Sequence, residues 1–158
     1  MFEIDEKLTA YLDAENLSID MPSKNHASVW SNIVMSFYQY KNKYRIFSQL
    51  TVLLNGKETV PDLCIYPNEE INWEFDEIVV TQTPVTVIEI LSPQQGMQDL
   101  IEKFGFYFHA GVLSCWLVLP ALQQVVVYQK DKTKKVFISG KIFDEVTQIE
   151  MDMKEVFA

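Results

Sequence analysis

Two acidic residues lie in apolar segments, where a carboxylate is unusual. Glu89 falls within TPVTVIEIL, residues 83–91, which is typical of a buried β-strand. Because side chains alternate along a strand, Glu89 is expected to share one face with Val85, Val87 and Leu91. An ionised, unpaired carboxylate that is removed from water is costly. Glu89 must therefore reach solvent, become protonated, pair with a cation or bind a metal ion.

Asp62 raises the same question in VPDLCIY, residues 60–66, which are also predicted to form a strand. It is expected to share a face with Cys64 and Tyr66, although aspartate is disfavoured in strands. One interpretation is that Asp62 and Glu89 are strand-end residues beside turns. The other is that the two acids end neighbouring strands, where a divalent cation relieves their repulsion and uses both as ligands.

A lysine on the following predicted helix, residues 95–110, could complete such a site. Asp99 and Lys103 are four residues apart and face the same way, so they could form a surface ion pair of about 0.3–0.5 kcal/mol. Alternatively, Lys103 lies over the strand ends near Glu89, where its ammonium can orient a water molecule or stabilise charge on a phosphate. Tyr107 lies one turn further along the same face.

The elements that must position these residues follow from hydrophobic periodicity and turn residues. We expect helices over residues 2–14, 26–41 and 95–110, and strands over 44–54, 60–66, 84–91, 114–119, 124–129 and 135–139. Asn55-Gly56 predicts a hairpin turn, and residues 67–82 a polar loop. One mixed sheet with helices at two points of the chain indicates a single α/β domain over residues 1–158, on the border with α+β.

Composition narrows the possible functions. The net charge is −9, from 13 basic and 22 acidic residues, which argues against a protein that coats nucleic acid and is compatible with local phosphate contacts or a carboxylate–metal site. We find no apolar run long enough to span a membrane and no signal-peptide pattern, so we expect a cytoplasmic protein without membrane contact. Cys64 and Cys115 lie in apolar runs and are expected to be buried free thiols.

The ordered motifs resemble the putative restriction endonuclease family of the PD-(D/E)xK nuclease superfamily. The resemblance covers about residues 60–129 and extends more loosely back to His26. Its motifs are Pro-Asp at one strand, Glu-x-x-Ser-Pro at the end of another, Asp-x-x-x-Lys and a tyrosine on the next helix, and then Gly-Val with a tryptophan-containing strand. Pro-Asp alone carries no information, whereas the ordered set at these spacings is specific.

The resemblance implies a restriction-endonuclease-like core, with a mixed β-sheet flanked by helices, and an active site that binds Mg²⁺ or Mn²⁺. Asp62 and Glu89 would be catalytic residues and metal ligands, and the backbone carbonyl of Ile90 would be a further ligand. The superfamily commonly places its lysine two residues after the second acid, where this chain has Leu91. The helix residue Lys103 would then take over the catalytic role of that lysine.

Other residues would support these ligands, and some depart from the family pattern. His26 matches a position where the family often has histidine and could reach the metal, but a helix-capping or surface histidine is the alternative. The family often has an acid in the strand before Pro-Asp, where this chain has Gln49, which adds no charge for a cation. Gln49, Asp99, His26 and Tyr107 are the expected supporting residues.

Three functions remain open on these grounds. The first is metal-dependent hydrolysis of phosphodiester bonds in DNA by a homodimer, the assembly expected for nucleases of this kind. The second is a weak or inactive nuclease-fold protein that acts as an oligomeric interaction or regulatory module. The third is a nuclease whose target is RNA, or modified or branched DNA.

Overall fold

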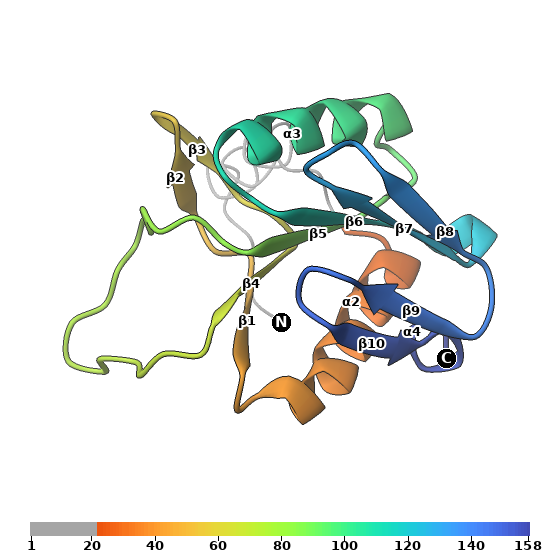
Figure 1. Ribbon diagram of the computed structural model, residues 1–158, viewed down its shortest axis with the longest axis horizontal. Helices are drawn as coiled ribbons and strands as arrows, with labels where there is room; N and C mark the ends of the chain where they lie inside the picture. Colours follow the sequence, from red (N-terminus) through yellow and green to blue (C-terminus); the bar gives the residue numbers. More distant parts are fainter. Residues whose placement is uncertain (1–21) are drawn as a thin grey trace, which may run out of the picture.

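The computed structural model describes residues 22–158, and the predicted helix over 2–14 lies outside this range. Its centre is a six-stranded sheet in the order β1-β4-β5-β6-β7-β8 (Figure 1). β5 and β6 pair in parallel, and the other neighbouring strands of this sheet pair antiparallel. The strands are β1 (Tyr44–Ser48), β4 (Leu63–Pro67), β5 (Thr86–Ile90), β6 (Ser114–Leu119), β7 (Gln124–Gln129) and β8 (Lys134–Phe137).

Helix α3 (Met97–His109) covers one face of the sheet and connects β5 to β6 (Figure 1). A parallel pair needs a crossover of this kind, because its second strand must start at the same end as the first. The hairpin of β2 (Val52–Leu54) and β3 (Lys57–Thr59) packs on the same side. Leu100 and Phe104 of α3 are buried with residues of β5 and β6 in the core of this face.

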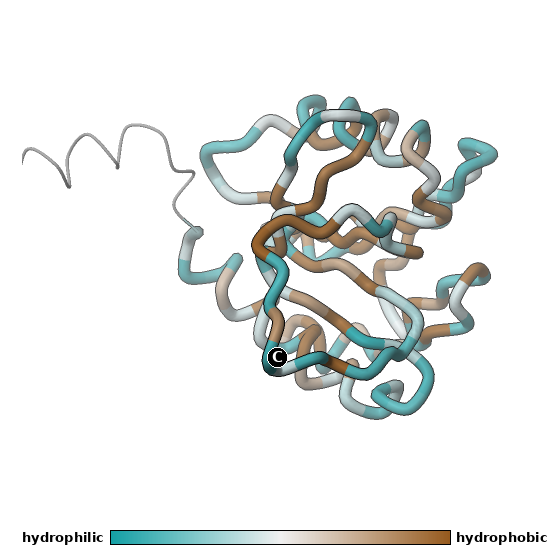
Figure 2. The backbone as a smooth tube through the Cα atoms, turned by 90° about the vertical axis from the view of Figure 1, so that its left-hand side faces the viewer, coloured by the Kyte–Doolittle hydropathy of each residue, from teal (hydrophilic) through white to brown (hydrophobic). Residues whose placement is uncertain are grey.

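The opposite face is covered by α2 (Lys24–Phe37), by the hairpin of β9 (Lys141–Asp144) and β10 (Ile149–Asp152), and by α4 (Met153–Val156) (Figure 1). Two short 3₁₀ turns, η1 (Tyr38–Tyr40) and η2 (Pro120–Leu122), follow α2 and β6. The residues between the covering layers are largely hydrophobic, whereas many residues in peripheral turns are hydrophilic (Figure 2). The two faces of the sheet thus form two cores, one on each side of β4, β5 and β6.

The predicted fold class is confirmed, because the mixed sheet is flanked by helices. The strands predicted over 114–119 and 124–129 match β6 and β7. The Asn55-Gly56 turn is also confirmed, with both residues at positive φ, 48° and 74°, as a two-residue hairpin turn with primed geometry requires.

Two strand predictions need correction. The strand over 44–54 is divided at Gln49, whose φ of 49° is left-handed and ends β1. The strand predicted over 60–66 begins only at Leu63, and β3, which follows the hairpin turn, is a separate short strand. Asp62 therefore lies just before β4, so strand alternation does not fix the direction of its side chain.

The last part of the chain contains elements that the periodicity did not predict: β9 (Lys141–Asp144), β10 (Ile149–Asp152) and α4. A buried aspartate ends β9 and obscures its apolar pattern. Over residues 22–158, no helix combines the length and apolar character needed to cross a membrane. Cys64 and Cys115 are buried free thiols, as predicted.

Candidate active site at the ends of β4 and β5

Glu89 lies on β5 beneath α3, and only 3% of its side chain is exposed. Its Oε1 atom accepts hydrogen bonds from Lys103 Nζ at 3.0 Å and from Tyr107 Oη at 2.7 Å. The Tyr107 hydroxyl also lies 3.2 Å from the hydroxyl of Thr59, at the end of β3. The four-residue spacing of Lys103 and Tyr107 on α3 therefore directs both groups at one carboxylate oxygen.

The electrostatics of Glu89 follow from this environment. Burial raises the pKa of Glu89, the Lys103 ammonium opposes that rise, and the nearby Asp62 carboxylate adds to it. Burial of the Tyr107 hydroxyl, reinforced by the Glu89 charge, likewise raises the pKa of Tyr107, so this group stays protonated and donates. The Lys103 ammonium and, to a smaller extent, the hydrogen bond from Tyr107 are therefore what favour the ionised form of Glu89.

Asp62 lies beside Glu89 at the start of β4, with 20% of its side chain exposed. Its Oδ2 atom accepts the Ile90 backbone N–H at 2.7 Å and lies 3.1 Å from His26 Nε2. Its backbone carbonyl accepts from Trp30 Nε1 at 3.3 Å and from the Gln49 amide at 3.2 Å. The hydrogen bond to Ile90 ties Asp62 to the residue that follows Glu89.

His26 reaches the site from the first turn of α2. The hydroxyl of Ser23, the N-cap residue, accepts the His26 backbone N–H at 3.2 Å and so fixes the start of this helix. His26 is buried, and its hydrogen bond with Asp62 raises the pKa of its imidazole, against the effect of burial. Each of the two carboxylates thus has its own basic partner, His26 for Asp62 and Lys103 for Glu89.

The donor set suits one class of ion better than another. The hydrogen bonds described above use Asp62 Oδ2 and Glu89 Oε1; within residues 22–158 none is formed to Asp62 Oδ1 or Glu89 Oε2. The same residues contain no group of three or more His, Cys, Asp or Glu side chains placed to hold a metal. That excludes a closed zinc-type cage there, but it fits Mg²⁺, which commonly uses one or two carboxylates together with waters and substrate phosphates.

The remaining predicted residues are placed differently. Asp99 is exposed in the first turn of α3, and no ion pair joins it to Lys103, which instead contacts Glu89. Gln49 is exposed and meets the site through its backbone amide. Sequence reasoning missed Thr59 and Trp30, whose contacts depend on tertiary packing; the aromatic Trp30 was visible only as one member of an apolar helix stripe.

A second buried carboxylate, Asp144, lies on the other side of the sheet. Its Oδ2 accepts from Ser114 Oγ and Trp116 Nε1, each at 2.7 Å, and its Oδ1 accepts from the Val146 amide at 2.9 Å. Ser114 is also 2.6 Å from the Thr86 hydroxyl. Because its partners are neutral donors that fill both oxygens, Asp144 stabilises the β9–β10 hairpin on the sheet rather than forming an open site.

The fold and the paired carboxylates define this chain as a restriction-endonuclease-like domain. This class of fold is established among nucleases. The chain belongs to the Uma2 family, described as "putative restriction endonuclease", whose model matches residues 4–153. The fold is similar to that of a putative nuclease belonging to DUF820 from Anabaena variabilis ATCC 29413, with a TM-score of 0.74 and 22% identity over 87% of this chain and 82% of that one. No curated protein matches the sequence.

Proposed function

We propose that this protein is a metal-dependent nuclease that hydrolyses phosphodiester bonds in DNA. One observation carries the proposal. The Ile90 backbone N–H donates a hydrogen bond to Asp62 Oδ2 at 2.7 Å, and Lys103 Nζ donates one to Glu89 Oε1 at 3.0 Å. These two contacts bring two carboxylates and a lysine together at one end of β5. Membership of a family described as "putative restriction endonuclease" supports DNA as the substrate.

In this proposal Asp62, Glu89 and the backbone carbonyl of Ile90 hold Mg²⁺ or Mn²⁺. Such an ion polarises a phosphate and lowers the pKa of a water ligand. Lys103, which is 39% exposed, orients the attacking water or neutralises charge that develops on the phosphate. Tyr107 keeps Glu89 in position by its hydrogen bond, and His26 holds Asp62.

The net charge of −9 limits how DNA is bound. Few phosphates can be contacted by lysine or arginine, so we expect contacts with the DNA backbone only near the site. The affinity for DNA should then depend strongly on the bound divalent ion. The proposal retains a homodimer and a cytoplasmic location, where the buried thiols Cys64 and Cys115 remain reduced.

Thermal unfolding and plasmid nicking test the proposal together. Millimolar Mg²⁺ or Mn²⁺ is expected to raise the melting temperature of the wild type, because an ion bound only to the folded state stabilises it, and Glu89→Ala should abolish the rise. Lys103→Ala should keep or enlarge the rise, because its ammonium no longer competes with the ion for Glu89, but should lower nicking by roughly 100-fold or more.

Lys154→Ala is the matched control, because Lys154 is exposed on α4, away from the site, and should nick plasmid at the wild-type rate. The absence of any metal-induced shift in the wild type would contradict the enzymatic function. Equal nicking by wild type and Lys103→Ala would show that the cleavage comes from another protein or another site.

A second candidate function, an interaction module, is favoured by the segment over residues 68–82. Trp73, Phe75 and Ile78 in this segment are 88%, 76% and 88% exposed, which is unusual for large apolar side chains. The segment projects from the sheet beyond β4 (Figure 1). We expect these side chains to be covered by another copy of the chain in a homodimer.

Sedimentation analysis tests this candidate. Changing Trp73 and Phe75 together to serine should convert a dimer to a monomer, while the melting temperature at low protein concentration stays unchanged because both side chains are exposed. The matched control changes Met35 to serine, an apolar residue exposed elsewhere, on α2. A wild type that is monomeric at all concentrations would refute self-association through this segment.

A further inference from the structure

A threonine of the β2–β3 hairpin lies behind the residues that contact the Glu89 carboxylate. Thr59 is the last residue of β3 and is partly buried, and its hydroxyl lies 3.2 Å from the Tyr107 hydroxyl. Tyr107 is fully buried and donates to Glu89 Oε1 at 2.7 Å. Over residues 22–158 the Thr59 hydroxyl forms no other hydrogen bond. Within that range its one contact therefore leads, through Tyr107, to Glu89.

The chemistry of the three groups determines the direction of both hydrogen bonds. A tyrosine hydroxyl has one proton to donate and can also accept, whereas an ionised carboxylate can only accept. The Tyr107 proton is therefore donated to Glu89, and this is the shorter of the two bonds because its acceptor is charged. Thr59 must then donate its own proton to the Tyr107 oxygen. Hydrogen bonds that are linked in this order strengthen each other.

The backbone around the hairpin fixes the position of Thr59. Thr59 pairs with Val52 across the hairpin, and Val52 is fully buried. The backbone N–H of Leu53 donates to the Val80 carbonyl at 2.8 Å, and the Val80 N–H donates to the Thr51 carbonyl at 2.9 Å. These bonds attach the hairpin to a segment well outside it in the sequence. The Thr59 hydroxyl is therefore placed by a tethered backbone and a short side chain.

We propose that Thr59 is a positioning residue of the candidate active site. Its hydroxyl directs the single Tyr107 proton to Glu89 Oε1, and Glu89 Oε2, which has no hydrogen bond over residues 22–158, stays available to a divalent cation. Groups behind a metal ligand orient that ligand, and their loss weakens binding although they never touch the ion. The inference rests on the proposed function and adds a residue of the hairpin to its site.

Mn²⁺ binding to the full-length protein tests this role without turnover. Free Mn²⁺ is measured by electron paramagnetic resonance while the wild type and each variant are titrated. Thr59→Val keeps the shape of the side chain but loses the hydroxyl, and should weaken binding roughly tenfold, the lower end for loss of a group behind a metal ligand. Thr59→Ser keeps the hydroxyl and should bind within about twofold of the wild type. Equal weakening in both variants would assign the effect to the methyl group and overturn the inference.

A double substitution shows whether Thr59 acts through Tyr107. Tyr107→Phe removes the hydroxyl that joins Thr59 to Glu89. In this background Thr59→Val should change the Mn²⁺ affinity by less than about twofold, because the connection between the two residues is already broken. A further loss of roughly tenfold in this background would show that Thr59 acts by another route, and it would overturn the inference.

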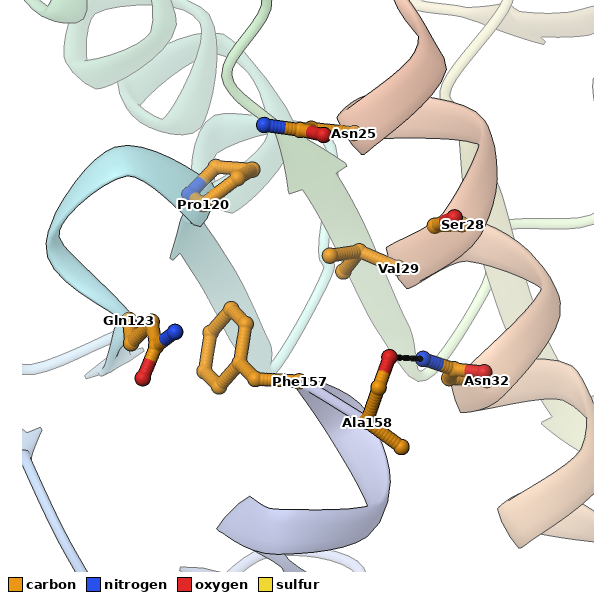
Figure 3. A pocket seen from close by; sticks show the side chains of 8 residues that line it. All are labelled: Asn25, Ser28, Val29, Asn32, Pro120, Gln123, Phe157 and Ala158. Atoms are coloured by element: carbon orange, nitrogen blue, oxygen red, sulfur yellow. Dashed lines mark hydrogen bonds between the residues drawn. The ribbon is translucent and has the colours of Figure 1, made fainter.

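Two controls separate positioning from a general loss of stability. Thr83→Val removes a threonine hydroxyl that donates to the Ala110 carbonyl at 3.4 Å and does not contact the carboxylates. Asn32→Ala removes an amide that donates to the Val156 and Ala158 carbonyls at 3.0 and 3.4 Å, on the side of the sheet opposite α3 (Figure 3). Both variants should melt below the wild type but bind Mn²⁺ with wild-type affinity. Equally weakened binding in the controls would overturn the inference.

A metal-free measurement separates this inference from the function on which it rests. Urea unfolding in EDTA gives the unfolding equilibrium constants of the wild type, Thr59→Val, Glu89→Gln and the double variant. Thr59 and Glu89 share no direct hydrogen bond, so the effect of Thr59→Val should shrink by more than about twofold in the Glu89→Gln background only if Tyr107 connects them. Independent effects would overturn the inference and leave the nuclease proposal intact. A wild type that shows the coupling but binds no Mn²⁺ would contradict the metal-dependent function and support the positioning of Glu89.

Discussion

Glu89 carries the strongest conflict between burial and charge among the residues of the candidate site. Its carboxylate is 3% exposed, and the hydrogen bonds from Lys103 and Tyr107 offset the cost of removing it from water. Removing one partner of such a buried pair leaves an uncompensated charge, which is more damaging than removing both. Glu89→Gln keeps the shape of the side chain while removing its charge.

The raised pKa of Glu89 gives the metal-free protein a defined pH dependence. A raised folded-state pKa means that the folded protein binds the proton more tightly than the unfolded chain does. The contribution of Glu89 to the free energy of unfolding is therefore fully present below about pH 4.5, its ordinary pKa, and is lost as the pH rises through the raised value.

Glu89→Gln removes this titration. The difference in the free energy of unfolding between wild type and Glu89→Gln, measured by urea unfolding in EDTA from pH 4 to 8, is expected to move in favour of the variant as the pH rises. Carboxylates remote from Glu89 titrate equally in both proteins, so they cancel in the difference. Parallel stability curves over this range would show that Glu89 has an ordinary pKa.

At the scale of elements, the site depends on where β1, β4 and β5 end. β1 ends at Gln49, whose amide binds the backbone carbonyl of Asp62, and Asp62 in turn binds the Ile90 amide at the end of β5. The φ of 49° at Gln49 is costly for a residue with a Cβ. The break between β1 and β2 thus shapes the acidic end of the sheet.

Gln49→Gly is expected to raise the free energy of unfolding by up to about 1 kcal/mol, because glycine adopts positive φ without steric cost and the Gln49 side chain is exposed. Gln49→Val should lower it by a similar amount or more, since a β-branched side chain resists this conformation. Chemical denaturation of the three proteins checks the order. A glycine variant less stable than the wild type would mean that the glutamine side chain makes a stabilising contact.

Much of this arrangement could be predicted from the sequence, because it depends on local pattern. The continuous apolar run over residues 114–119 correctly predicted the strand β6. The four-residue spacing of Lys103 and Tyr107 correctly predicted that both lie on one face of α3. The break at Gln49 could not be predicted, since glutamine carries no signal for positive φ. The family resemblance named His26 as a supporting residue, but its contact with Asp62 could not be predicted, because it depends on how α2 packs against the sheet.

At the scale of the whole molecule, the β9–β10 hairpin is attached to the main sheet through Asp144. Its carboxylate lies between the hairpin and β6, and its partners include the hydroxyl of Ser114 and the indole of Trp116, both fully buried. The same hairpin contributes Ile142, Ile149 and Met151 to the core on the α2 face. Loss of this carboxylate therefore affects the core without touching the candidate active site.

Asp144→Ala is expected to lower the free energy of unfolding by about 3 kcal/mol, because the buried donors of Ser114 and Trp116 lose their acceptor. Asp152→Ala, which removes the N-cap of α4, is the control and should cost about 1 kcal/mol. Urea unfolding gives both values. Similar small losses in the two variants would show that the network around Asp144 contributes little beyond a single hydrogen bond.

Lys103 has a consequence for the order in which ligands bind. Its ammonium already neutralises Glu89 at 3.0 Å, so under the proposed function a divalent ion competes with a tethered cation that cannot diffuse away. The displaced ammonium stays within one side-chain length and needs a new anion, which a phosphodiester provides. Ion and substrate then strengthen each other's binding by the same factor. In the absence of nucleic acid, the lysine acts as a built-in competitor that holds the site in an idle state.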